Sequence, residues 1–276
     1  MNHAANEYWG REDLLEAVLG ALLASGKNLD QLSTDDLAPL DQFHSGGKGT
    51  TTQLAHLAGL RTGMRVLDVG GGLGGPARTL AREFGCHVTV LEPVESYLRA
   101  GRALTERLGL GEQVKHEFGD ALELPFAEST FDAVWTQNAG MNITDKEQLY
   151  AGFHKVLRGG GILAFQEPMA GPIQPLVFPV MWAADQAGSF LRPPAEMRVV
   201  IEAAGFASRQ WRDVTKEIPA RRGAVPRESI PFLIKGDGMD AITLSGQRNE
   251  SEGRLVHVQA VFEKLSLGLD ARPISE

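Results

Sequence analysis

Apolar residues recur with helical spacing near the start of the chain. Within residues 12–25, Leu14, Leu15, Val18, Leu19, Leu22 and Leu23 form the stripe of an amphipathic helix. Gly26 follows this segment and is a typical helix stop. The sequence GTTTQLAHLA at 49–58 predicts another helix, and the polar stretch between the two predicts a turn and a short helix. We therefore predict an N-terminal helical cap over residues 1–60.

From Met64 onward, short apolar runs alternate with helical patterns. The predicted strands are MRVLDVG, HVTVLE, VKHEF, FDAVWTQ, GGILAFQEP, SRQWRDVT and LVHVQAVFEK. Strands that alternate with helices predict an α/β fold, here a Rossmann-like, doubly wound, mostly parallel seven-stranded sheet. We assign residues 61–276 to this core, with a lid insertion at about 169–193. The stretch 216–253 gives no clear pattern beyond one helix near 227–235.

A glycine-rich turn over residues 66–76, VLDVGGGLGGP, joins the first predicted strand to a helix. Glycine allows a ligand to approach the backbone, and the helix N-terminus offers free N–H groups. Gly70, Gly72 and Gly75 match the dinucleotide pattern G-x-G-x-x-G. Gly70, Gly72 and Gly74 match the G-x-G-x-G turn of S-adenosylmethionine enzymes. The glycines by themselves therefore leave both ligand classes open.

Acidic residues near the ends of the first three strands favour the second class. Asp68 precedes the glycine turn, where its charge would oppose a pyrophosphate but attract an ammonium or sulfonium group. Glu92 ends the second strand, where a carboxylate accepts hydrogen bonds from ribose hydroxyls. Asp120 follows the third strand, where it can hold the exocyclic amine of adenine. The three acids together predict a site for a positively charged nucleoside.

The ordered set VLDVGGGLGG, VTVLEP, GDALELPF, FDAVWTQ and HKVLRGGGILAFQEP, over roughly 64–168, resembles class I S-adenosylmethionine-dependent methyltransferases. The similarity is greatest to the small-molecule branch with sarcosine/dimethylglycine and ubiquinone/menaquinone-pathway methyltransferases. The resemblance implies S-adenosyl-L-methionine as cofactor, with S-adenosyl-L-homocysteine as product. It implies that the cofactor contacts are Asp68, Gly70, Gly72, Gly74, Glu92, Pro93, Asp120, Ala121, Gln137, His44 and Gly46.

The acceptor side is defined less sharply. Relatives in this branch often have His where this chain has Asn142, and an amide cannot act as a general base. His44, Glu167 and Tyr8 are the remaining candidate bases, and we expect the reaction to depend mainly on proximity and in-line geometry. The predicted substrate contacts are Tyr8, Trp9, Asn142, Met181 and Trp182. Because aromatic residues occur in the insertion, we expect N- or O-methylation of an aromatic or heterocyclic metabolite.

Composition and net charge limit the classes of binding partner that we expect. Hydrophobic residues make up 43% and charged residues 22% of the 276 residues, as in an ordinary globular protein. The net charge of −8 argues against nucleic acid or anionic lipid as a partner. No leader or membrane segment is read, and Cys86 is the single cysteine, so we expect a cytoplasmic protein without a metal site. The alternatives left open are a non-catalytic S-adenosylmethionine-binding module and an NAD(P)-dependent oxidoreductase.

Overall fold

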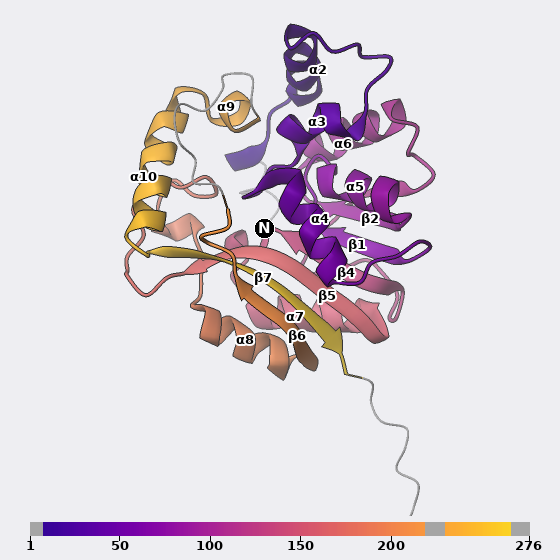
Figure 1. Cartoon of the computed structure of the whole chain (residues 1–276). Coiled ribbons are helices and arrows are strands. Elements are labelled where there is room, and N and C mark those ends of the chain that lie inside the picture. Colours follow the sequence, from indigo (N-terminus) through magenta and orange to yellow (C-terminus); the bar gives the residue numbers. More distant parts are fainter. Residues whose placement is uncertain (1–7, 219–229, 266–276) are drawn as a thin grey trace, which may run out of the picture.

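A seven-stranded sheet forms the centre of the computed structural model, which describes residues 8–218 and 230–265 (Figure 1). The strands are β1 Arg65–Val69, β2 His87–Glu92, β3 Val114–Phe118, β4 Phe131–Gln137, β5 Leu157–Ala170, β6 Phe206–Asp213 and β7 Leu255–Lys264. Their order is β3-β2-β1-β4-β5-β7-β6. The neighbours from β3 to β5 pair in parallel, whereas β7 pairs antiparallel with both β5 and β6. The predicted fold class is therefore confirmed.

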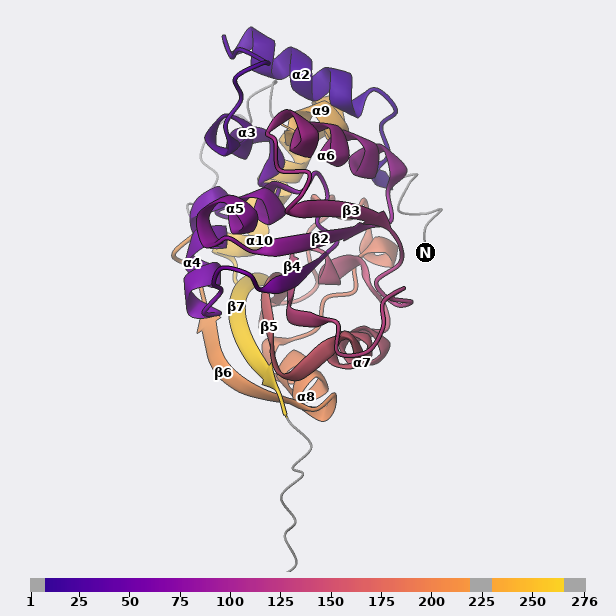
Figure 2. The ribbon, with the colours of Figure 1, turned by 90° about the vertical axis from the view of Figure 1, so that its right-hand side faces the viewer.

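Helices cover both faces of the sheet (Figures 1 and 2). They are α2 Leu14–Ala24, α3 Thr34–Asp41, α4 Gly47–Leu57, α5 Gly75–Phe84, α6 Glu95–Arg107, α7 Lys146–Val156, α8 Pro194–Ala203, α9 Ile230–Lys235 and α10 Met239–Ser251. Leu54 of α4 and Leu80 of α5 pack on one face, and Phe153 of α7 and Ile201 of α8 pack on the other. Because both faces are covered, the central strands are apolar on both sides.

The N-terminal helices pack on α6. Leu14 of α2 and Leu37 of α3 belong to the same buried cluster as Leu104 of α6, and Figure 2 shows α2 lying outside α6. Asp41 at the end of α3 and Arg78 in α5 form an ion pair with an N···O distance of 2.7 Å, and both side chains are at most 2% exposed. This ion pair links α3 of the N-terminal helical segment to α5 of the core, beside the glycine turn. The boundary at residue 60 stays a prediction.

The C-terminal third contains the main departure from the predicted elements. Helix α10 lies within the stretch that had no clear pattern, because its apolar residues are few and Gly246 lies among them. The helix expected near 227–235 begins at Ile230, and residues 219–229 lie outside the described part of the chain. Among the described helices, none has both the length and the apolarity needed to cross a bilayer.

Candidate active site

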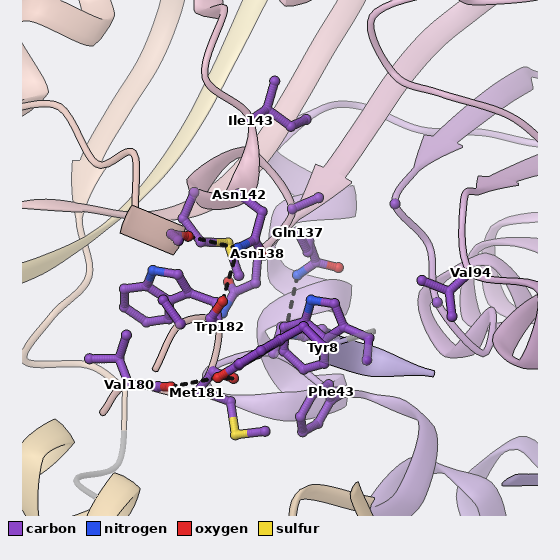
Figure 3. A pocket seen from close by; sticks show the side chains of 18 of the residues that line it. Tyr8, Phe43, Val94, Gln137, Asn138, Asn142, Ile143, Val180, Met181 and Trp182 are labelled. Carbon is purple, nitrogen blue, oxygen red and sulfur yellow. Dashed lines mark hydrogen bonds between the residues drawn. The ribbon is translucent and has the colours of Figure 1, made fainter. Parts of the chain in front are cut away.

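A cavity of about 650 Å³ opens at the carboxyl end of the parallel strands. Its walls come from the glycine turn, the ends of β2 and β4, the N-terminal segment at Tyr8, the loop after β5, and α10. Figure 3 shows side chains of the N-terminal segment, the ends of β2 and β4 and the loop after β5 around one space. Open parallel sheets bind ligands at this edge, where the loops after neighbouring strands meet. The volume lies within the roughly 300–1,000 Å³ that is typical of small-molecule pockets.

The glycine turn follows β1 in a conformation that requires glycine. Gly70 has a φ of 69°, and an added Cβ would lie 2.5 Å from the Cβ of Ala139. Gly72 has a φ of 56°, lines the cavity, and donates its N–H to Glu92 Oε2 at 2.9 Å. A Cβ on Gly72 would have Tyr97 as its nearest neighbour, at 3.7 Å, so the backbone is exposed to the cavity. A ligand can therefore lie directly against this turn.

Asp68 and Glu92 lie together beneath the turn, both buried. Burial, and then the nearby charge of Glu92, raise the pKa of Asp68 to about 7. Burial also raises the pKa of Glu92 to about 7, although its hydrogen bonds from the Val94 and Gly72 N–H groups oppose the shift. Within the described residues, Asp68 Oδ2 has no hydrogen-bond partner. Two buried carboxylates with an unpartnered oxygen fit a cationic ligand that donates hydrogen bonds.

We expect cofactor binding to strengthen as the pH rises from 6 to 7.5, because a cationic ligand and ribose hydroxyls prefer these two acids ionised. The affinity should rise by at most about tenfold per pH unit for each coupled proton. The raised pKa values of Asp68 and Glu92 also affect the stability of the ligand-free fold. Their contribution is fully present at pH values below about 4, which is the pKa of these groups in the unfolded chain, and it is lost as the pH rises through 7. Titration calorimetry with S-adenosylmethionine across this range measures the first effect. Asp68→Asn should flatten the profile; a profile as steep as that of the parent protein would contradict this assignment.

His44 and Gln137 form a polar network at the cavity wall. His44 Nε2 lies 3.1 Å from Gln42 Oε1 and 3.0 Å from Thr51 Oγ1, and Gln137 Oε1 accepts hydrogen bonds from Thr51 and Trp135 at 3.0 Å. Burial lowers the pKa of His44 to about 4, so its ring is neutral at pH 7. A neutral imidazole accepts a proton poorly when its protonated form is this unfavourable. The geometry therefore favours His44 as a positioning residue over a general base.

Tyr8 also lines the cavity, and its hydroxyl points at the loop after β5 (Figure 3). It donates to the carbonyls of Val180 and Met181, each at 3.3 Å. Burial raises the pKa of Tyr8 to about 12. Because this hydroxyl stays protonated at neutral pH, Tyr8 is suited to bind the N-terminal segment to the loop rather than to take a proton.

The predicted acceptor contacts meet around the same loop. Trp9, Asn142, Met181 and Trp182 all line the cavity, together with Tyr8. Asn142 Nδ2 donates to the carbonyls of Trp182 at 3.0 Å and Gly188 at 3.2 Å. The amide thus holds the loop over the cavity. Their roles toward a substrate stay predictions.

The remaining cofactor candidates fall into two groups. Pro93, Asp120 and Ala121 line the cavity beside Glu92, and Asp120 Oδ1 accepts the Leu122 N–H at 2.9 Å. Gly46 and Gly74 do not reach the cavity. A Cβ on Gly46 would lie 2.2 Å from Thr50, and one on Gly74 would lie 2.8 Å from His116. These two glycines are required for the starts of α4 and α5, and the structure does not support them as cofactor contacts.

Glu167 is also absent from the main cavity, which corrects its prediction as a base. Its Oε1 accepts the N–H groups of Ala139 at 3.2 Å and Gly140 at 3.0 Å, and the Thr136 hydroxyl at 3.2 Å. Only 4% of Glu167 is exposed, and burial raises the pKa of its carboxyl group. Glu167 therefore holds the loop after β4 in place from behind.

The sequence interpretation missed the cavity wall made by α10 and the start of β7. Glu250 and His257 line the cavity there, with Glu250 Oε1 and His257 Nε2 separated by 3.5 Å. His257 is 3% exposed, and within the described residues neither of its ring nitrogens has a hydrogen-bond partner. The histidine within the apolar run LVHVQAVF is the sequence signal that could have identified it.

Comparisons with known proteins agree with this geometry. Residues 66–161 match the family model described as a methyltransferase domain. A sterol 24-C-methyltransferase from Eremothecium gossypii is 40% identical over 114 residues, which are 41% of this chain and 31% of that protein. A glycine/sarcosine/dimethylglycine N-methyltransferase from Actinopolyspora halophila is 26% identical over 81% of this chain and 39% of its own length. The matches thus span about a third of these relatives.

The fold is also similar to that of solved structures. A structure of phosphoethanolamine N-methyltransferase 2 from Haemonchus contortus, in complex with S-adenosyl-L-methionine, superposes with a TM-score of 0.70. It is 17% identical, and the match covers 96% of this chain and 60% of that chain. At this identity the similarity establishes the fold, and the chemistry has to be argued from the cavity.

Proposed function

We propose that this chain, whose residues 66–161 match a methyltransferase domain, is a class I S-adenosylmethionine-dependent enzyme that methylates nitrogen or oxygen of an aromatic or heterocyclic small molecule. The observation that carries the proposal is the pair of buried acids, Asp68 and Glu92, beneath a glycine turn in a cavity that extends to the loop after β5 and to α10. S-adenosylmethionine supplies a methyl group already activated by its sulfonium. The acceptor side is argued from this chain alone.

Each residue's part follows from its place in the cavity. Asp68 accepts hydrogen bonds at the ammonium end of the cofactor, with Gln137 beside it. Glu92 accepts hydrogen bonds from the ribose, while Pro93, Asp120 and Ala121 bind the adenine. Gly72, whose added Cβ would meet nothing closer than 3.7 Å, lets the cofactor approach the backbone closely.

The acceptor enters from the opposite wall. Tyr8, Trp9 and Trp182 enclose it and exclude water, and Asn142 holds the loop closed over it. Holding a nucleophile about 3 Å from the methyl carbon, in line with sulfur, supplies roughly 7–11 kcal/mol of the barrier reduction. With Tyr8 protonated and His44 neutral, the geometry favours an acceptor atom that needs no strong base.

Binding and transfer experiments test the proposal directly. Titration calorimetry should give micromolar binding of S-adenosylmethionine and S-adenosylhomocysteine, and none of NADH, whose pyrophosphate is opposed by Asp68. The reverse result would support the oxidoreductase instead. A screen of candidate metabolites with methyl-labelled cofactor then tests transfer. Cofactor binding with no transfer to any acceptor would favour the non-catalytic module.

A further inference from the structure

The charges around the cavity are of one sign. Its lining includes six acidic side chains, namely Asp41, Asp68, Glu92, Asp120, Asp185 and Glu250. Among the described residues that line it, there is no lysine or arginine. A carboxylate, phosphate or diphosphate is normally recognised by arginine or lysine, or by a cluster of backbone N–H groups. An anionic acceptor would therefore find no lysine or arginine among the described lining residues to bind it.

The described lysine at the aromatic rim of the cavity does not change this balance. Lys235 approaches the aromatic rim of the cavity but does not line it. Its ammonium lies 3.2 Å from the ring centroid of Tyr8 and 4.6 Å from that of Trp9, and it donates to the Tyr8 carbonyl at 3.0 Å. Its donors are thus directed at the N-terminal segment.

Five of the six acids already have a function in the structure or in the proposed cofactor site. Asp41 pairs with Arg78, and Asp68, Glu92 and Asp120 lie around the glycine turn. Asp185 accepts the Ala187 N–H at 2.9 Å and caps a short turn of the loop. Glu250 remains. It belongs to α10, which lies apart from α5 and α6 in Figure 1, and its side chain is 34% exposed.

Glu250 has a fixed partner behind it and open space beside it. His257 lies 3.5 Å away, and its backbone is held because its N–H donates to Thr215 Oγ1 at 2.8 Å. Its register neighbour on β5 is Pro168, which carries no charge. On α10, Gly246 lies four residues before Glu250, and Thr243 lies three residues before Gly246, so the three residues share one face of the helix. A Cβ on Gly246 would meet nothing within 4 Å. An apolar body therefore has room to lie over Gly246.

We propose that Glu250, backed by His257, binds an ammonium group of the methyl acceptor, and that the acceptor is an amine with an apolar body rather than an anion. The inference rests on the proposed function, because it assigns the second ligand of the same cavity. It gives α10 a function in acceptor selection. Because Gly246 has no side chain, it leaves space on the surface of α10 for the apolar part of that molecule.

Matched ligands that differ only in charge test the inference. The protein, saturated with S-adenosylhomocysteine, is titrated with tryptamine, tryptophol and indole-3-acetate, and with hexylamine, hexanol and hexanoate. We expect the amine of at least one set to bind tenfold or more tighter than its carboxylate. Equal or tighter binding of both carboxylates, or no measurable binding of either amine, overturns the inference.

Variants separate the charge of Glu250 from a general structural effect. Glu250→Gln should weaken amine binding about tenfold while the Kd of the corresponding alcohol stays within twofold. Glu112→Gln, which removes one charge from the loop before β3, outside the cavity, is the control and should change neither. Gly246→Leu should weaken the amine and the alcohol together without altering S-adenosylhomocysteine affinity. An unchanged amine Kd in Glu250→Gln overturns the inference, whereas loss of S-adenosylhomocysteine binding by the parent protein would instead overturn the proposed function.

Discussion

Replacing Gly72 with valine should lower S-adenosylmethionine affinity by about 100-fold or more, a loss of roughly 2.7 kcal/mol or more of binding free energy. Gly72 has a φ of 56° and faces the cavity, so a branched side chain would occupy the space that the cofactor needs. The substituted residue would also be strained at this φ and would disturb the hydrogen bond from the Gly72 N–H to Glu92. Titration calorimetry measures the affinity, and circular dichroism reports whether the fold is kept.

The matched control is Gly109→Val. Gly109 has a φ of 67°, and a Cβ there would meet nothing within 4 Å, but the residue does not line the cavity. The backbone strain is thus similar in the two variants, whereas only the first blocks the ligand. We expect Gly109→Val to reduce the melting temperature and leave the cofactor Kd unchanged. Equal affinities for the two variants would show that the turn does not contact the cofactor.

Removing the Asp41 carboxylate should cost about 3–5 kcal/mol of unfolding free energy, the largest stability effect that we expect from a single substitution. Asp41→Ala leaves Arg78 charged and 0% exposed, with hydrogen bonds only to the Gly101 carbonyl and the Thr105 hydroxyl. The pair joins α3 to α5 beside the cavity, so α3 should also become less protected. Urea denaturation measures the free energy, and hydrogen exchange over residues 34–41 measures the local effect.

A surface pair provides the comparison. Glu12 and Arg99 form an ion pair at 2.8 Å with side chains 94% and 57% exposed. Glu12→Ala should therefore cost less than about 1 kcal/mol. Adding Arg78→Met to Asp41→Ala should recover much of the lost stability, because the double variant no longer buries an uncompensated charge. If Asp41→Ala and Glu12→Ala lower the free energy of unfolding by the same amount, the Asp41–Arg78 pair does not stabilise the helical segment as a buried ion pair.

The strands of the sheet, the glycine turn and the acids around that turn could all be predicted from the sequence. These signals are local: the apolar run of β1, the glycines after it and Asp68 lie within a dozen residues. The carboxyl ends of parallel strands meet at one edge, so Glu92 and Asp120 could be placed near Asp68 without coordinates. Their roles toward the cofactor stay predictions.

The cavity wall formed by α10 and the start of β7, and the functions of single side chains, became apparent only from the tertiary structure. Helix α10 has weak periodicity, and Glu250 meets His257 because β7 runs antiparallel and brings its first residues to the carboxyl edge. Glu167 ends a strand at that same edge, yet its carboxylate turns behind the loop to the Ala139 and Gly140 N–H groups. Orientation and burial depend on packing between distant segments, and strand and helix patterns do not encode those contacts.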